Sequence, residues 1–230
     1  MATREFANGD GITVVRAKNG GNYSKGRNGY SIDTITPHCT AGLMSDDCIK
    51  TFYSTKDYCP NYSIGETGKI FGHVSEANRS WCTCSSYNDN RAITIECDSE
   101  ASEEYFMPAA VINSLKKLCI NICNYYGKTR LVCDYNLGNT AHYNGSVKEL
   151  TYPSNDDGKT MYLTFHRWFT AKSCPGDYFY SKAKAFAEEV TAALGGTAQT
   201  TKMSDLITSG ADVAAKKAVI AKVGGLFTAD

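Results

Sequence analysis

The sequence predicts an α/β fold. Short β-branched segments that alternate in polarity recur along the chain, and two longer segments with helical periodicity are interleaved with them. The chain has 230 residues, of which 42% are hydrophobic and 21% are charged, and this is enough apolar material for one packed domain with an appendage. The composition excludes a disordered or collagen-like chain.

The first third of the chain supplies three expected strands. Residues 1–30 are rich in Gly, Asn, Lys and Arg and are expected to form an extended arm with turns. The alternating residues 31–36 predict a strand that ends near His38. Residues 61–65 and 69–74, separated by a short turn, have the spacing of a β-hairpin.

The middle of the chain predicts a strand, a helix and another strand. Ala92–Cys97 alternates, which places its two isoleucines on one face and Glu96 on the other, solvent-facing side. From Pro108, apolar residues recur at intervals of three to four and predict an amphipathic helix that stops at Gly127. Residues 131–133 should form a short buried strand after it.

The last third ends in helices. Residues 136–160 are polar and rich in turn formers, and residues 161–166 resume as a strand or its approach. Residues 180–194 are alanine-rich with helical periodicity and are followed by glycines. We expect residues 196–202 to be a linker and residues 204–223 to form one more helix.

Charge and hydropathy limit the partners of the chain. The 24 basic residues balance the 24 acidic ones, so no net field attracts the protein to nucleic acid or to an anionic membrane. No stretch approaches the roughly 18 apolar residues of a membrane span, and no apolar stretch follows the N-terminal charges. We therefore expect synthesis in the cytoplasm without a signal peptide, and release by another factor if the protein acts outside the cell.

Two histidines and one cysteine form the strongest candidate site. His38 and His166 both lie at expected strand ends, and Lys172 and Cys174 follow His166 at six and eight residues. Two imidazoles and a thiolate are good zinc ligands, and a three-ligand site leaves a position for water. Each histidine taken singly could be an ordinary buried residue, and Cys174 could belong to a disulfide. The combination favours one zinc ion, and most of the ten cysteines are interpreted as free thiols.

Four segments carry a family resemblance. In order along the chain they are ITPHCTAG at 35–42, NRSW at 78–81, NDNRAITIE at 88–96 and HRWFTAKSCPG at 166–176. In these segments the chain resembles type 2 zinc N-acetylmuramoyl-L-alanine amidases, which include many phage endolysins and are related to peptidoglycan recognition proteins. The resemblance covers roughly residues 30–195. It implies a central mixed β-sheet flanked by helices. The N-terminal arm would then be residues 1–30 and the catalytic domain residues 31–195. A linker and a short helical tail would follow at residues 196–230.

The resemblance implies an activity and a set of roles. The activity is hydrolysis of the amide bond between N-acetylmuramic acid and L-alanine in bacterial peptidoglycan. The implied zinc ligands are His38, His166 and Cys174, the implied catalytic carboxylate is Glu96, and Lys172 is the implied cation near the reacting carbonyl. These roles agree with the chemistry of zinc-activated water and of a carboxylate that transfers the proton.

The chain departs from the family pattern at two places. Many relatives have an aromatic hydroxyl eight residues before the hairpin glycine, but counting back from Gly68 reaches Pro60, which leaves Tyr62 as a candidate groove residue. Many relatives also have a histidine directly after the tryptophan at position 81, where this chain has Cys82. The family pattern therefore does not identify the substrate contacts in these two regions.

Other residues near these motifs admit two interpretations. The amphipathic ring of Trp81 suits sugar and peptide contacts, although it could belong to the core. Arg167 could pair with carboxylates of the stem peptide or form an ordinary salt bridge. Cys82 and Cys84 place thiols near the proposed metal, and Cys39 should point from its strand into the core.

Two other functions remain as alternatives to a phage or prophage endolysin. The chain could bind peptidoglycan without catalysis, although relatives of that kind typically lack the cysteine ligand that Cys174 would supply. It could also be a zinc peptidase that cuts within the stem peptide. The tail after residue 195 could bind the wall, form a dimer surface or begin a second domain. Peptidoglycan or its muropeptides are the expected partner, and the oligomeric state is left open.

Overall fold

The computed structural model of the chain describes residues 3–18, 21–102, 104–154 and 156–195. The expected linker and helical tail at 196–230 lie outside the described residues. Within the described ranges, no helix is long and apolar enough to cross a membrane.

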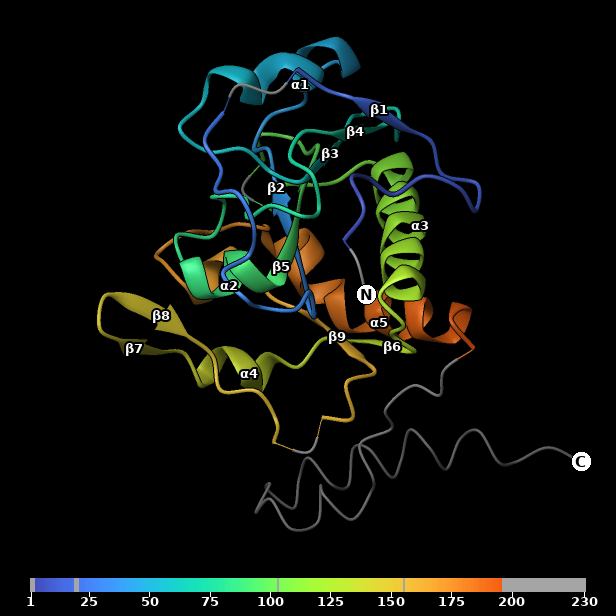
Figure 1. Cartoon of the computed structure of the whole chain (residues 1–230). Helices are drawn as coiled ribbons and strands as arrows, with labels where there is room; N and C mark the ends of the chain where they lie inside the picture. The colour runs from blue at the N-terminus through green and yellow to red at the C-terminus, as the bar shows by residue number, and fades with distance from the viewer. Residues whose placement is uncertain (1–2, 19–20, 103, 155, 196–230) are drawn as a thin grey trace, which may run out of the picture. The chain divides into compact units, whose positions relative to one another are not determined.

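A seven-stranded mixed sheet forms the centre of the molecule (Figure 1). Its order is β1-β4-β3-β5-β2-β9-β6, and β3 and β4 are antiparallel whereas the other neighbouring strands are parallel. The strands are β1 (Val14–Arg16), β2 (Thr34–Cys39), β3 (Tyr62–Ile64), β4 (Ile70–Gly72), β5 (Ala92–Cys97), β6 (Arg130–Val132) and β9 (Thr160–Leu163). The expected mixed sheet and the hairpin are confirmed.

Helices cover both faces of this sheet. They are α1 (Asp46–Phe52), η1 (Tyr53–Thr55), α2 (Ser86–Arg91), α3 (Ala109–Tyr125), α4 (Tyr135–Asn139), η2 (His166–Trp168) and α5 (Asp177–Ala193). The larger apolar cluster joins β5 to α3 and α5, which lie next to each other in Figure 1, through residues such as Ile95, Leu115 and Phe186. A smaller cluster packs Ile49 and Tyr53 against Phe71.

The alternation of β5 is as expected, but its polar face is not open to solvent. Ile93 and Ile95 belong to the main core, whereas Glu96 lies on the other face. Glu96 is nevertheless only 7% exposed, because helices and loops also cover this face. The expectation of a solvent-facing Glu96 is therefore wrong, and the carboxylate is buried.

Short elements appear where the sequence indicated only turns. Strand β1 comes from the N-terminal arm and pairs with β4 along the edge of the sheet. The polar segment 136–160 contains α4 in part, followed by the two-stranded hairpin of β7 (His142–Asn144) and β8 (Val147–Glu149). Neither of these segments has an alternating run long enough to identify its strands from the sequence.

Candidate metal centre and active site

His38, His166 and Cys174 come together at one end of the sheet. His38 lies near the end of β2, His166 begins η2 just beyond β9, and Cys174 lies on the loop that follows. Because β2 and β9 are parallel neighbours, their carboxyl ends share an edge. One potential ligand atom of each residue lies within 4.8 Å of the other two, and His38 Nδ1 is 3.3 Å from Cys174 Sγ.

The two imidazoles are suited to metal binding. The Nε2 atoms of His38 and His166 are buried and have no hydrogen-bond partner, which is unusual for buried polar atoms. Burial lowers the pKa of His38 well below its usual value, and burial together with the charge of Lys172 lowers the pKa of His166 to about 4. Both rings are therefore neutral, which is the form that ligates metals. The donor set of two imidazoles and one thiol fits zinc.

The loop that carries Cys174 is tied back to η2. The backbone N–H of Arg167 donates to the carbonyl of Cys174 at 3.3 Å, and its guanidinium contacts Asp177 and the carbonyl of Ser173. The Cys39 thiol lies in hydrogen-bond contact with Cys174, and this contact together with burial raises the pKa of Cys174. Cys39 packs against the core as expected, but the sequence did not indicate its contact with the proposed ligand thiol.

Glu96 lies on the strand next to His38. The Cα partner of His38 in the β2–β5 ladder is Glu96. Burial raises the pKa of this carboxyl well above its usual range, and a hydrogen bond from Tyr53 opposes that effect. Tyr53, at the α1–η1 junction, is 1% exposed. It supplies an aromatic hydroxyl beside the carboxylate, although it belongs to none of the recognised segments and no spacing indicated it.

Lys172 is exposed on the same loop as Cys174, and its charge acts on His166. Its backbone N–H donates to the carbonyl of Thr170 at 2.9 Å, which fixes the backbone of the loop there. The loop therefore brings a cation close enough to His166 to lower the pKa of its ring.

Tyr62 is not a groove residue. Its Cα partner in β5 is Ile95, so Tyr62 lies on the core face, opposite to Glu96. The residue is 0% exposed, and its hydroxyl donates to Glu76 at 2.6 Å and accepts from the N–H of Ala7 at 2.7 Å. The prediction of a substrate contact for Tyr62 is therefore wrong, because alternation along β3 directs this ring into the interior.

The other two candidate substrate residues differ in their surroundings. Trp81 is 43% exposed and donates from its indole Nε1 to Ser24 at 2.9 Å, so part of an aromatic side chain is presented to solvent. The guanidinium of Arg167 pairs with Asp177 at 2.8 Å and lies over the ring of Tyr180. Of the two interpretations of Arg167, these contacts match the ordinary salt bridge, and they hold the loop that carries Cys174.

All ten cysteines, which lie within the described residues, are free thiols. Burial, together with the charge of Glu96, raises the pKa of Cys82. Cys84 is exposed, and neither thiol belongs to the cluster of potential ligands. His73 is 2% exposed and bonded through Nε2 to Ser63 Oγ at 2.7 Å, so it is a structural residue outside the cluster of potential ligands.

Comparison with known proteins decides the family. The family model described as N-acetylmuramoyl-L-alanine amidase matches residues 28–177, well over half of the chain. The chain belongs to the N-acetylmuramoyl-L-alanine amidase family. The match spans every residue of the candidate site of this amidase, from His38 to Cys174.

Solved structures resemble the amidase in fold. The catalytic domain of XlyA is 13% identical with a TM-score of 0.50, and the match covers 78% of this chain and 99% of that one. N-acetylmuramoyl-L-alanine amidase LysC from Clostridium intestinale URNW is 17% identical with a TM-score of 0.46, covering 81% and 99%. No curated protein matches the sequence.

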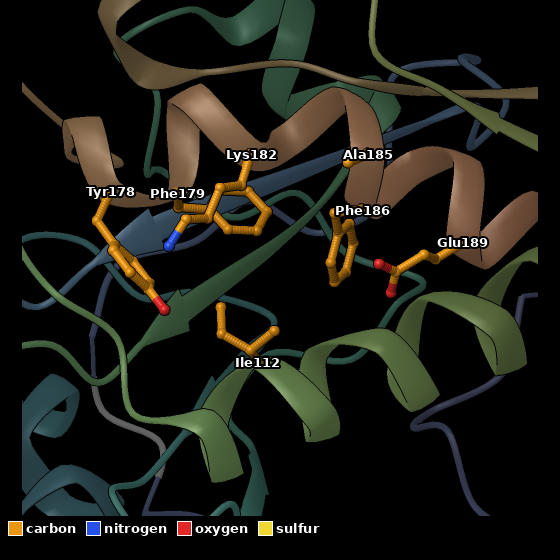
Figure 2. Close-up of a pocket in the computed structure, with 7 residues that line it drawn as sticks. All are labelled: Ile112, Tyr178, Phe179, Lys182, Ala185, Phe186 and Glu189. Carbon is orange, nitrogen blue, oxygen red and sulfur yellow. The ribbon is translucent and has the colours of Figure 1, made fainter. Parts of the chain in front are cut away.

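A separate pocket of about 220 Å³ lies between α3 and α5 of the amidase (Figure 2). It is lined by Ile112 of α3 and by α5 residues between Tyr178 and Glu189, and Figure 2 shows the Lys182 and Glu189 side chains at its margins. None of the candidate site residues lines it. The candidate chemistry is therefore located at the strand ends and not in this pocket.

Proposed function

We propose that the chain is a zinc-dependent amidase that cleaves the bond between N-acetylmuramic acid and L-alanine in peptidoglycan. The observation that carries the proposal is the convergence of His38, His166 and Cys174, with Glu96 on the adjacent strand. A group of two neutral imidazoles and a thiol at a strand edge is typical of a catalytic zinc site with three protein ligands.

The residues would divide the reaction among them. Zinc, when bound, lowers the pKa of water and polarises the scissile carbonyl. Glu96, on the strand next to His38, would in its ionised form accept a proton from the attacking water and return it to the departing amine of alanine. Lys172 can bring its ammonium to the oxygen that gains negative charge. Trp81 offers an exposed ring on which a sugar or peptide group can pack.

The same proposal places the action of the enzyme at the bacterial cell wall, in an endolysin-type lytic role after release from the cell in which it is made. This part rests on the sequence resemblance. It is tested by adding the purified protein to suspensions of intact and outer-membrane-permeabilised bacteria and following turbidity. A loss of turbidity with release of soluble muropeptides supports the lytic role, and intact walls in both suspensions contradict it.

The bond that is cut is tested with the purified protein and defined muropeptides. Mass spectrometry should show intact sugars and a peptide with a free L-alanine amino group, and the protein should contain one zinc per chain. Glu96→Gln should lower kcat by about 10²–10⁴-fold while zinc stays bound. Glu66→Gln, in the exposed turn of the β3–β4 hairpin, is the matched control and should leave kcat unchanged.

Three results would contradict the proposal. New reducing sugars would indicate a glycosidase, and a cut inside the stem peptide would indicate a peptidase. Stoichiometric binding of muropeptide without any cleavage would indicate a binding protein.

A further inference from the structure

Three buried polar side chains contact one another close in sequence or space to the strand positions that carry the two histidines. Thr36 precedes His38 by two residues on β2, Thr164 precedes His166 by two residues beyond β9, and Asn88 projects from α2. All three are 0% exposed. We call them the Thr–Asn triangle. None belongs to the predicted ligand or catalytic set.

The three side chains form a closed ring of three hydrogen bonds, in which each side chain donates to the next. The amide Nδ2 of Asn88 donates to Thr36 Oγ1 at 3.0 Å, and the hydroxyl of Thr164 donates to Asn88 Oδ1 at 2.9 Å. The two threonine hydroxyls are 2.7 Å apart, and since Thr164 has used its proton, Thr36 donates to it. Each hydroxyl proton and the amide oxygen of Asn88 therefore has a partner, which fixes the orientation of all three side chains.

The triangle joins β2 to β9 where their backbone ladder stops. The register of these strands has two residue pairs, Thr34 with Tyr162 and Ile35 with Leu163, and the N–H of Thr164 donates to the carbonyl of Ile35 at 3.1 Å. The ladder pairs end there, so the contact between Thr36 and Thr164 is the next link toward the histidines. The ring centroids of His38 and His166 are 5.1 Å apart.

We propose that the Thr–Asn triangle positions His38 and His166 and so sets the affinity and geometry of the zinc centre. The inference rests on the proposed zinc amidase function. In this account Thr36, Thr164 and Asn88 are positioning residues that touch neither metal nor substrate. Loss of a group that hydrogen-bonds a metal ligand typically costs 10–100-fold in metal affinity. The triangle acts on the two histidines through the backbone, from positions two residues before each of them.

The test is the zinc dissociation constant of Thr164→Val, measured by competition with a chromophoric chelator on the full chain. Valine keeps the shape of threonine but removes the hydroxyl, so we expect zinc binding to weaken by about 10–100-fold. The visible spectrum of the cobalt-substituted protein should change as well, because its bands report ligand geometry. Zinc affinity and cobalt spectrum equal to those of the wild type would overturn the proposal.

Two further variants separate positioning from stability. Thr191→Val removes a buried hydroxyl of α5 that bonds the N–H and carbonyl of Leu131 in β6, both at 2.9 Å, and neither residue belongs to the ligand cluster. It should lower the melting temperature and leave zinc affinity unchanged. The triple variant Thr36→Val, Thr164→Val, Asn88→Leu leaves no polar group of the triangle unpaired, so it should be more stable than Thr164→Val yet still bind zinc weakly.

These measurements also distinguish a failure of the proposed zinc amidase function from a failure of the positioning role. A wild-type protein that neither binds zinc nor cleaves muropeptides contradicts the proposed function itself. A wild-type protein that does both, together with a triple variant of unchanged zinc affinity, contradicts only the positioning role. If Thr164→Val does not fold, the triple variant alone decides between these outcomes.

Discussion

At the scale of single residues, the environment of Glu96 depends on a tyrosine from outside the recognised segments. Burial favours the protonated carboxyl, and the hydroxyl of Tyr53 is a hydrogen-bond donor that favours the ionised form. Tyr53 is held by edge-on contacts with the rings of Phe52, Tyr58 and His73. These contacts hold the Tyr53 ring in the interior beside the carboxyl of Glu96.

We predict that Tyr53→Phe lowers kcat by roughly 10–100-fold with little change in KM. A hydrogen bond to a charged group is worth about 1.5–3 kcal/mol, and here it would be lost at the catalytic carboxylate. Steady-state kinetics on a defined muropeptide provide the measurement. In the Glu96→Gln background the same change should have almost no further effect, because Tyr53 acts through Glu96.

Tyr62→Phe is the matched control for Tyr53→Phe. It also removes a buried tyrosine hydroxyl, but on the opposite face of the sheet, where the hydroxyl contacts Glu76 and Ala7. It should reduce stability and leave kcat and KM unchanged. A normal kcat in Tyr53→Phe, or a raised KM in Tyr62→Phe, would contradict this assignment of the two tyrosines.

At the scale of elements, the long periodic segments and the β3–β4 hairpin were predictable, whereas β1 and the β7–β8 hairpin were not. Strand β5 has the bounds that alternation indicated, and α3 and α5 differ from the expected helices by a few residues at their ends. Three-residue strands such as β1 and β7 owe their structure to the partner strand, and no local pattern specifies them. The burial of Glu96 could not be predicted for a similar reason. The sequence of β5 shows which face Glu96 occupies, but not that elements distant in sequence cover that face.

Helix α2 shows how one buried charge organises a neighbouring loop. Asp89 accepts hydrogen bonds from the hydroxyl of Thr83 at 2.7 Å and from its N–H at 3.2 Å, which folds the loop before the helix back onto it. Burial raises the pKa of Asp89 to about 7, against the opposing influence of these bonds and of Arg79 and Arg27.

We predict that Asp89→Asn removes part of the pH dependence of stability. Because the folded-state pKa of Asp89 is raised, its contribution is fully present below the unfolded value of about 4 and is lost as the pH rises through 7. At 1.36 kcal/mol per pH unit, the variant should gain about 4 kcal/mol relative to the wild type between pH 4 and pH 8. Urea unfolding across this range measures the difference.

Asn at position 89 keeps an acceptor for Thr83, so the loop should stay folded in this variant. Asp47→Asn, at an exposed position of α1, controls for the loss of one negative charge. A difference in unfolding free energy between wild type and Asp89→Asn that stays constant with pH would show that Asp89 is ionised throughout.

At the scale of the whole molecule, the ligand cluster was predictable because it follows from chain order and strand ends. His38, His166 and Cys174 were expected from their neighbours in sequence, and parallel strands bring such positions to one edge. The contribution of the N-terminal arm was not predictable, because its partners are more than 40 residues away. Arg4 bonds to Glu76 at 3.0 Å, and Arg27 donates to the carbonyl of Glu76 at 2.6 Å.

The arm supplies buried charges to the core of the sheet. Glu76 is 0% exposed and is bonded by Arg4 and by the hydroxyls of Tyr62 and Tyr126. Arg27 is 6% exposed and also donates to the carbonyls of Asp89, Asn90 and Ala92, which no other arm residue reaches in the described hydrogen bonds. Removing one partner of a buried ion pair costs about 3–5 kcal/mol.

We predict that a chain starting at residue 28, where the family match begins, does not fold stably. It would leave Glu76 buried without Arg4, expose the edge of β4 by removing β1, and lose the donors of Arg27. The broken ion pair alone costs about 3–5 kcal/mol, and the other losses add to it. A domain of this kind is stable by only roughly 5–15 kcal/mol. Circular dichroism and thermal unfolding measure the outcome, and a chain of residues 1–195, which keeps all the described residues, is the matched control. A cooperative transition of the shortened chain near that of the control would show that the arm is dispensable.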